Sequence, residues 1–111
     1  MDDCVFCNIA SKLVEAEMVF ESSSLIVIKD ILPKAPVHLL VIPKEHIISV
    51  HHLEPKHAGL VGVMVETAEE MARQFQVAES GYKLVFNVGK DGGQVIPHLH
   101  LHLLGGKRFA E

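Results

Sequence analysis

The chain lacks the charge and the long apolar runs that mark nucleic-acid-binding and membrane proteins. Ten Lys and Arg stand against fourteen Asp and Glu, a formal net charge of −4, so no excess of positive charge is available to neutralise a run of phosphates. The longest apolar runs, 39–42 and 60–65, fall far short of the ~20 residues that span a bilayer. We therefore expect neither a nucleic acid nor a membrane as partner.

A secretory signal is also missing. The acidic start, Met1-Asp2-Asp3, has neither basic residues nor a long apolar run. We expect a cytoplasmic protein in which the only two cysteines, Cys4 and Cys7, stay reduced. With 111 residues, of which 49% are apolar and 22% charged, the chain has the size and balance of a single folded domain covering 1–111, and not those of a disordered chain.

Hydrophobic periodicity predicts an α+β fold. Apolar residues recur every three or four positions between Pro55 and Ala78, which predicts one long helix that ends before Gly81. A short helix is expected within the first ten residues. Alternating or β-branched segments predict five strands: 18–21, 25–29, 37–42, 82–88 and 98–104. An antiparallel sheet of about five strands, with the long helix on one face, leaves the other face open for chemistry.

Histidine is the residue in excess, with eight copies against one tyrosine and no tryptophan. His98, His100 and His102 alternate with three leucines. Because side chains alternate across a strand, the imidazoles should share one face while the leucines point to the core. Three interpretations fit this spacing: a catalytic row, a stripe that chelates a transition metal, and a plain solvated face.

The segment just before this strand is rich in backbone donors. Its sequence is Asn87-Val88-Gly89-Lys90-Asp91-Gly92-Gly93-Gln94, and paired glycines let backbone N–H groups approach an anion closely. The same pair is common in ordinary hairpin loops. Next to a row of neutral bases, such a loop favours chemistry at phosphorus.

Three segments together resemble a known family. Residues 98–106 look like the signature of the histidine triad family, and 91–94 and 30–38 are similar to its Hint branch, the nucleoside phosphoramidases. The resemblance implies an α+β homodimer whose two sheets join edge to edge. It also implies a purine nucleotide substrate, with hydrolysis of the P–N bond of nucleoside 5′-phosphoramidates, or of the related bond of aminoacyl-adenylates, and release of AMP or GMP.

The resemblance assigns roles to four histidines. His100 would be the nucleophile that forms a covalent nucleotidyl-histidine, which water then hydrolyses. We expect its other ring nitrogen to bond the backbone carbonyl of His98, the first residue of the triad. His102 would contact a phosphate oxygen, and His38 would assist with the phosphate and the leaving group.

The same resemblance implies a nucleotide-binding surface. Asp30 would accept hydrogen bonds from the ribose hydroxyls. Four apolar residues match positions that line the base pocket: Phe6, Ile9, Ile28 and Ile31. Four residues of the glycine-rich loop match the phosphate-binding positions: Asn87, Gly93, Gln94 and Val95. Val95 stands where many family members carry a serine, so a hydroxyl is missing and only the backbone N–H remains. Plain core packing explains the apolar residues equally well.

The two cysteines form a C-x-x-C pair, which needs two further ligands to complete a zinc site. Some members of the triad family bind zinc this way, and the resemblance implies the ligands Cys4, Cys7, His46 and His98, with a structural Zn²⁺ and no organic cofactor. An unmetallated dithiol and a redox pair are the alternatives. His51, His52 and His57 have no comparable partners, so we expect them at the surface.

Other functions remain open beside the phosphoramidase. A non-catalytic nucleotide-binding or sensor module would bind without turnover, and Val95 is the residue that favours it. A zinc-stabilised interaction protein would do neither. A dinucleoside polyphosphate hydrolase belongs to another branch of the family, which has a different sequence after the triad than Gly105-Gly106.

Overall fold

A computed structural model describes residues 3–110, and it has the α+β architecture expected from the sequence. Five antiparallel strands lie in the order β1-β2-β3-β5-β4. The strands are β1 (Met18–Glu21), β2 (Leu25–Lys29), β3 (Val37–Pro43), β4 (Tyr82–Val85) and β5 (Leu101–Gly105). The helices are α1 (Val5–Ala10) and α2 (Ala58–Gln74), with 3₁₀ turns η1 (Val50–His52) and η2 (Pro55–His57).

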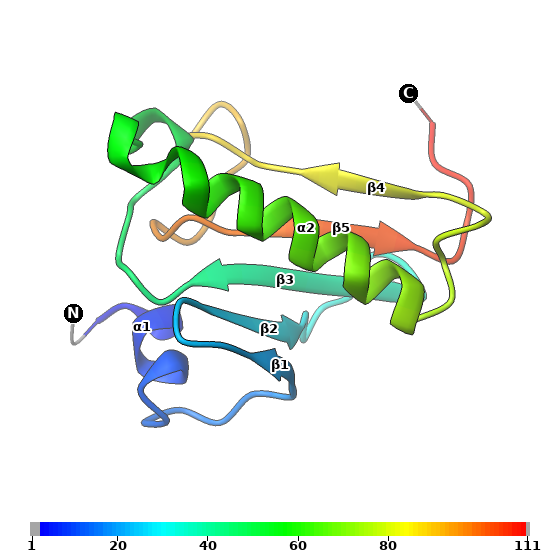
Figure 1. Cartoon of the computed structure of the whole chain (residues 1–111), viewed down its shortest axis with the longest axis horizontal. Coiled ribbons are helices and arrows are strands. Elements are labelled where there is room, and N and C mark those ends of the chain that lie inside the picture. Colours follow the sequence, from blue (N-terminus) through cyan, green and yellow to red (C-terminus); the bar gives the residue numbers. More distant parts are fainter. Residues whose placement is uncertain (1–2, 111) are drawn as a thin grey trace.

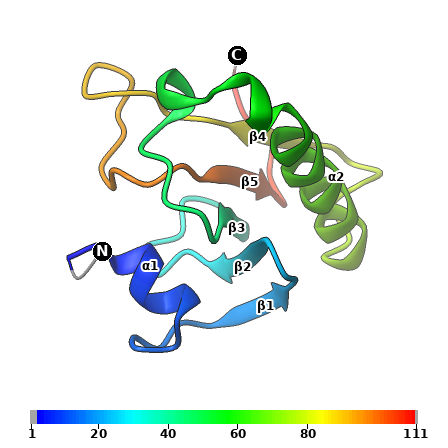
Figure 2. The ribbon, with the colours of Figure 1, turned by 60° about the vertical axis from the view of Figure 1, so that its left-hand side comes forward.

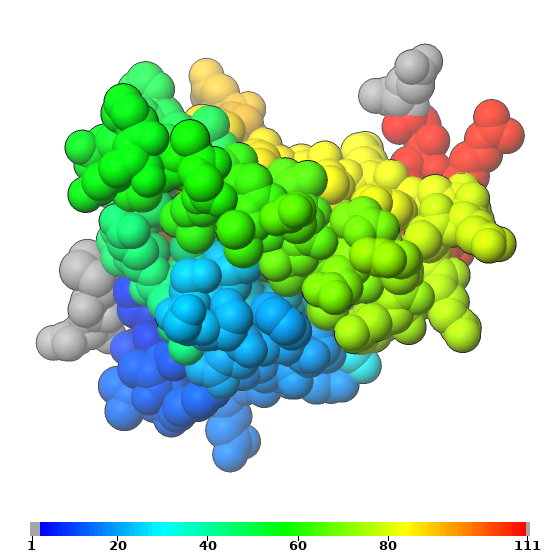
Figure 3. Space-filling model, viewed as in Figure 1, coloured from blue at the N-terminus to red at the C-terminus, as the bar shows by residue number. Residues whose placement is uncertain are grey.

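The two helices cover opposite faces of the sheet. The long helix α2 crosses the front of the sheet in Figure 1, and the turned view of Figure 2 places α1 on the other side. In the space-filling view, α2 and the β1–β2 hairpin form the surface over this front face (Figure 3). The chemistry predicted for the open face therefore lies on the side of α1. Within the described residues, no helix is both long and apolar enough to cross a membrane.

Burial on both faces explains why β2 and β3 are almost continuously apolar. Alternate residues of each strand pack under α2, and the others pack against α1. Ile28, for example, contacts the cluster that contains Phe6 and Ile9, whereas Val27 belongs to the larger core beneath α2. A strand that is covered on two sides loses the alternation of polar and apolar residues seen in half-exposed strands.

Several predicted boundaries are wrong by a few residues. The long helix begins at Ala58 because η2 takes up Pro55–His57 as a tighter turn, and it ends at Gln74 because Gln76 adopts a left-handed φ of 62°. The strand predicted over 82–88 ends at Val85. The last strand begins at Leu101 and not at His98, because the backbone before it pairs elsewhere: the Leu99 backbone N–H donates to the Ile47 carbonyl at 2.6 Å.

Candidate active site and metal centre

The triad alternates as predicted, although its first two histidines precede β5. Leu99, Leu101 and Leu103 are buried in the core beneath α2. The imidazoles point to the opposite face, where the Phe6 ring of α1 meets His98 and His100 edge-on, with ring centroids 5.7 and 5.1 Å apart. The first helix therefore packs directly on the histidine row.

His100 carries its lone pair on a defined nitrogen. Its Nδ1 lies 2.7 Å from the backbone carbonyl of His98, as expected from the sequence, so Nδ1 must donate and Nε2 is left as the free base. Burial lowers the pKa of His100, an effect that outweighs the hydrogen bond to His98 and the charge of Asp30. The ring is therefore neutral at neutral pH, with Nε2 as a free base.

His38 and His102 form a hydrogen-bond chain whose direction is fixed at one end. The backbone N–H of Lys34 donates to His38 Nδ1 at 3.1 Å, so His38 carries its proton on Nε2. That nitrogen lies 2.9 Å from His102 Nδ1 and donates to it. His102 must then carry its own proton on Nε2. The chain thus turns His102 into a hydrogen-bond donor, as its predicted contact with a phosphate oxygen requires.

Burial keeps both of these rings neutral. It lowers the pKa of His38, partly opposed by Asp30. The pKa of His102 falls to about 4, first through burial and then through its histidine neighbours His100 and His38. A neutral donor costs less to bury than an imidazolium.

Asp30 lies directly after β2 and beside the hydrogen-bonded pair His38 and His102. One carboxylate oxygen accepts the backbone N–H of Leu32 at 2.9 Å, which shapes the turn, and the other is 3.4 Å from His38 Nε2. Ile31, predicted to line a base pocket, is 87% exposed on the turn after Asp30. The other three predicted pocket residues, Phe6, Ile9 and Ile28, are buried together in the cluster under α1.

The glycine-rich loop is shaped by two of the residues predicted to bind the nucleotide, Asn87 and Gln94. Gln94 accepts the Gly89 backbone N–H at 2.9 Å and donates to the carbonyls of Ile48 and Ile96 at 2.7 and 3.0 Å. Asn87 Nδ2 donates to the Gly92 carbonyl at 2.9 Å. Both amides therefore hold the loop itself, and a ligand would meet backbone groups rather than the Gln94 amide.

The backbone of this loop favours glycine at two positions, Gly92 and Gly93. A Cβ on Gly92 would lie 2.2 Å from the Val88 carbonyl oxygen, so this position requires glycine. Gly93 has a φ of 82°, which also favours glycine. The Val95 side chain is 89% exposed and projects from the loop into solvent.

Four predicted metal ligands converge at one end of the histidine row. The ligand atoms of Cys4, Cys7, His46 and His98 all lie within 4.8 Å of one another. Individual separations include 3.2 Å from Cys4 Sγ to His98 Nδ1 and 3.3 Å from Cys7 Sγ to His46 Nδ1. A tetrahedral ion with ordinary Zn–S and Zn–N bonds holds its donors roughly 3.3–3.8 Å apart. The donor set therefore fits a tetrahedral metal ion with two sulfur and two nitrogen ligands.

His98 connects this centre to His100, the predicted nucleophile. Its Nε2 donates to the Pro43 carbonyl at 2.8 Å, which leaves Nδ1 free to face the cysteines, while its own carbonyl accepts from His100. Burial lowers the pKa of His98. Burial raises the pKa of the Cys7 thiol, and the hydrogen bond between Cys7 and Cys4 raises it further. A cation reverses the preference of a thiol for its protonated form, because the thiolate is the ligand.

One histidine expected at the surface is buried. His51 and His52 are exposed as predicted, but His57 is only 5% exposed and lies 3.0 Å from Glu45. The sequence did carry a signal. His57 follows Glu54 by three residues at the start of a helix, the position from which a side chain bonds back to the cap backbone, as His57 Nδ1 does with the Glu54 N–H.

Comparison with known proteins agrees with the fold. The family model described as "Scavenger mRNA decapping enzyme C-term binding" matches residues 3–109. "Protein HitA" of Neisseria gonorrhoeae is 44% identical over 95% of this chain and 97% of that protein. The "Purine nucleoside phosphoramidase" of Escherichia coli K12 is 34% identical over 96% of this chain and 89% of that protein.

Two solved structures extend the comparison. The HIT family hydrolase from Legionella pneumophila superposes with a TM-score of 0.96 at 41% identity, covering 97% of this chain and 96% of that one. A Zn-bound histidine triad family protein from Mycobacterium smegmatis superposes with a TM-score of 0.82 at 29% identity, covering 96% of this chain and 76% of that one.

Fold and histidine row together define a class of nucleotide-binding α+β hydrolases. Within that class, the chain belongs to the histidine triad family.

Proposed function

We propose that this protein is a purine nucleoside phosphoramidase: it hydrolyses the P–N bond of nucleoside 5′-phosphoramidates, or the related bond of aminoacyl-adenylates, through a covalent nucleotidyl-His100. The observation that carries the proposal is the bond from His100 Nδ1 to the His98 carbonyl, which leaves Nε2 as a neutral nucleophile. The name of the Escherichia coli relative gives independent support for the substrate class.

The proposed reaction has two balanced steps. His100 Nε2 attacks the α-phosphorus, a nitrogen–phosphorus bond forms, and the original P–N bond breaks as the departing amine takes up a proton. Water then attacks the phosphorus and gives up a proton, and the His100–phosphorus bond breaks to release AMP or GMP. In both steps His102 Nε2–H donates to a non-bridging phosphate oxygen, a role that the chain from Lys34 through His38 supports.

Binding of the nucleotide would use the surroundings of this row. Asp30 has one carboxylate oxygen directed at His38 and lies at the end of β2, where it would accept from the ribose hydroxyls. Phe6, Ile9 and Ile28 would form the floor beneath the purine, with Ile31 closing over it from its exposed turn. Backbone N–H groups near Gly93 and Val95 would hold the phosphate.

The metal that we propose for the four-donor centre is Zn²⁺. Two thiolates and two imidazoles in tetrahedral array are typical of structural zinc, and no position is left open for substrate. Zinc would tie α1 and the turn after β3 to the histidine row and supply no chemistry to the reaction. Such a thiol site is suited to a reducing compartment, so we propose a cytoplasmic location.

A homodimer is proposed from two exposed features. β4 ends the strand order, so its outer edge is unpaired within the described chain. Val63 on α2 and Leu84 on β4 are 42% and 36% exposed, and an added Cβ on Gly62 would meet nothing within 4 Å. An unpaired edge beside exposed apolar residues favours pairing with a second copy.

One experiment tests the activity and the assembly together. Wild-type protein and His100→Ala are incubated with adenosine 5′-phosphoramidate and with a matched P–O–P dinucleotide, and AMP release, metal content and sedimentation mass are measured. We expect AMP from the phosphoramidate, at least about 10³-fold slower in His100→Ala, from a dimer. No AMP from folded wild-type protein that still binds AMP would identify a sensor instead. Faster cleavage of the dinucleotide would favour the polyphosphate hydrolase.

A further inference from the structure

The metal donor His46 lies on a turn that has no regular secondary structure. Its neighbours are each tied to a different part of the chain. Lys44 bonds Glu21 at 2.8 Å, and the carbonyls of Ile47 and Ile48 accept from Leu99 and Gln94. These hydrogen bonds and ion pairs reach strand β1, the segment that precedes β5 and the glycine-rich loop. Glu45, immediately before the donor, is tied to the start of the long helix.

The tie at Glu45 is made by the buried histidine His57. The Glu54 backbone N–H donates to His57 Nδ1 at 3.0 Å, so the proton of the neutral ring is on Nε2. That N–H donates to the Glu45 carboxylate, with Nε2 and Oε2 3.0 Å apart. His57 is 5% exposed, and its backbone N–H bonds the Glu54 carbonyl at 2.9 Å. The imidazole is therefore held in one orientation from both sides.

His57 is also mounted on a rigid part of the molecule. It immediately precedes α2, whose Met64, Ala68 and Met71 are fully buried against the sheet. The Glu45 side chain, in contrast, is 55% exposed and belongs to the irregular turn. The pair therefore connects a fixed point on the helix to the residue that precedes a metal donor.

We propose that His57 and Glu45 are a positioning pair for the metal centre. They hold the turn so that His46 Nδ1 stays 3.1 Å from His98 Nδ1 and within reach of Cys7, whether or not a cation is present. The inference rests on the proposed metal centre. A donor that is already placed leaves less freedom to be lost on binding, and a loosened donor leaves the cation sooner.

The alternative is that His57 only stabilises the start of α2. In that case, removing the imidazole would lower the melting temperature and leave metal release unchanged, and removing the Glu45 carboxylate would affect neither. Metal release and thermal stability therefore separate the two roles. Glu45 is the better first site of mutation because half of its side chain is in solvent, so its replacement should not impair folding.

The test uses the full chain loaded with Zn²⁺. Zinc release to an excess of a chromophoric chelator is followed for wild type, Glu45→Ala, Glu45→Gln and His57→Phe, and the melting temperature of each metal-free protein is recorded. Glu69→Ala is the matched control, since Glu69 pairs with Arg73 on the exposed side of α2 and has the same charge. We expect Glu45→Ala and His57→Phe to release zinc about tenfold faster. Glu45→Gln, which still offers an oxygen to His57 Nε2–H, should remain close to wild type.

The double variant tests whether the two residues act together, and zinc loading of the wild type tests the metal centre itself. If the two residues act as one pair, Glu45→Ala/His57→Phe releases zinc no faster than either single variant. Wild-type release rates in Glu45→Ala, or equal acceleration in Glu69→Ala, would overturn the positioning role while leaving the metal centre intact. Wild-type protein that takes up no zinc would refute the metal centre itself, and this inference with it.

Discussion

Two clusters of potential metal ligands lie on the same face of the sheet, and they differ in where their protons are. Cys4, Cys7, His46 and His98 form one, and Asp30, His38 and His102 form the other. In each set the candidate ligand atoms are within 4.8 Å of one another, so composition and spacing alone would assign a cation to both. Their hydrogen bonds separate them.

The deciding feature is the second nitrogen of each ring. His98 donates from Nε2 to the Pro43 carbonyl, which leaves the lone pair of Nδ1 pointing among the thiols. His38 accepts the Lys34 backbone N–H at Nδ1, so its Nε2 carries a proton. Binding a cation at that Nε2 would move the proton to Nδ1, where it would face another N–H. The first cluster is suited to a metal, and the second to a directed chain of hydrogen bonds.

The largest effect expected from this difference is in metal content. Cys7→Ser removes a thiolate from the four-donor centre, and we expect bound zinc to fall from about one ion per chain to near zero. The metal-free protein should also unfold at a lower temperature, because zinc would no longer join α1 to the histidine row. Elemental analysis of the purified protein, with a thermal melt, measures both.

The matched change in the other cluster should leave zinc in place. His38→Phe removes the central ring of the hydrogen-bond chain and preserves the bulk of a buried side chain. Its zinc content should equal that of the wild type, while phosphoramidate turnover falls. Two zinc ions per wild-type chain, with one lost in His38→Phe, would show that the proton assignment for the second cluster is wrong.

The sequence predicted the fold well because its signals are local. Alternation placed Leu99 and Leu101 in the core and the histidines opposite, and it did so although the regular strand begins only at Leu101. The boundaries were less predictable because η2 and the left-handed Gln76 are single turns closed by local hydrogen bonds, such as that from the Val77 N–H to the Ala72 carbonyl, which the apolar periodicity does not report.

The sequence predicted the proton position of His100, from its hydrogen bond to the His98 carbonyl, but not those of His38 and His98. They depend on single backbone groups, the Lys34 N–H and the Pro43 carbonyl, that tertiary structure brings to each ring. Gln94 illustrates the same limit, because the residue matches a substrate-binding position, yet its side-chain amide forms hydrogen bonds to Gly89 and Ile48 within the protein. Residue identity predicted which side chains gather, and the backbone decides what each of them does.

Titration of His102 distinguishes the second cluster further. The pKa of His102 is about 4 in the fold, lowered by burial and by His100 and His38 and partly raised by Asp30, whereas in the unfolded chain it is about 6.5. Between these values the unfolded state binds a proton that the folded state does not, so stability falls as the pH falls from about 6.5 toward 4. A single group contributes at most about 1.4 kcal/mol per pH unit, and partial exposure reduces this.

Denaturant unfolding at pH 7, 6 and 5 measures this contribution as the difference between wild type and His102→Gln. Both proteins keep the four-donor centre, so acid release of the metal affects them alike and cancels in the difference. We expect the advantage of the wild type over the variant to shrink as the pH falls. A difference that does not change with pH would mean that His102 titrates normally in the fold.

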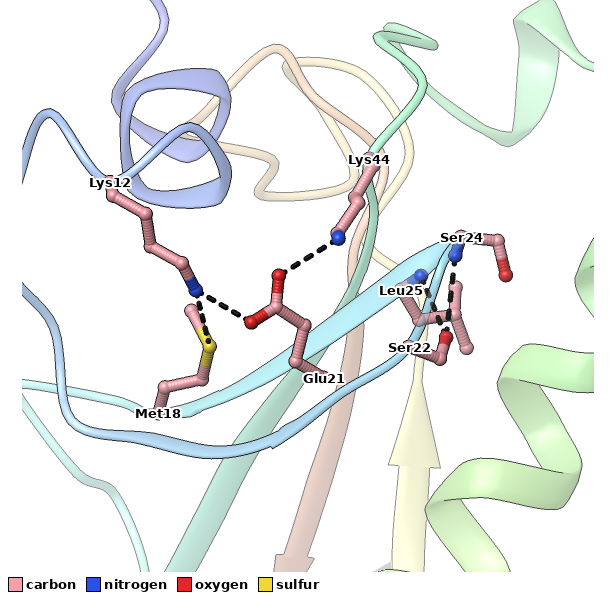
Figure 4. A network of polar contacts seen from close by, with 7 residues as sticks. All are labelled: Lys12, Met18, Glu21, Ser22, Ser24, Leu25 and Lys44. Atoms are coloured by element: carbon pink, nitrogen blue, oxygen red, sulfur yellow. Dashed lines mark hydrogen bonds and ion pairs between the residues drawn. The ribbon is translucent and has the colours of Figure 1, made fainter.

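The smallest expected effect comes from Glu21, which ties the two halves of the metal centre from outside. Its carboxylate accepts from Lys12 at 2.6 Å and from Lys44 at 2.8 Å (Figure 4). Lys12 follows the helix that carries Cys7, and Lys44 precedes His46 by two residues. The two lysines lower the pKa of Glu21 to about 2, so the ion pairs persist at neutral pH and are lost only as the pH falls from about 4.5 through 2.

Because this network is exposed, Glu21→Gln should lower the melting temperature by no more than about 2 °C at low ionic strength, and 1 M NaCl should abolish the difference. Glu17→Gln is the matched control, since Glu17 pairs with Lys29 on the same hairpin but does not touch the segments that carry the metal donors. Zinc release should be slightly faster in Glu21→Gln and unchanged in Glu17→Gln.

If 1 M NaCl does not remove the effect of Glu21→Gln on the melting temperature, the carboxylate acts by packing or backbone geometry and not through its charge. If both variants release zinc alike, the donors Cys7 and His46 are held by their own segments, and the outer ion pairs contribute nothing to the metal centre.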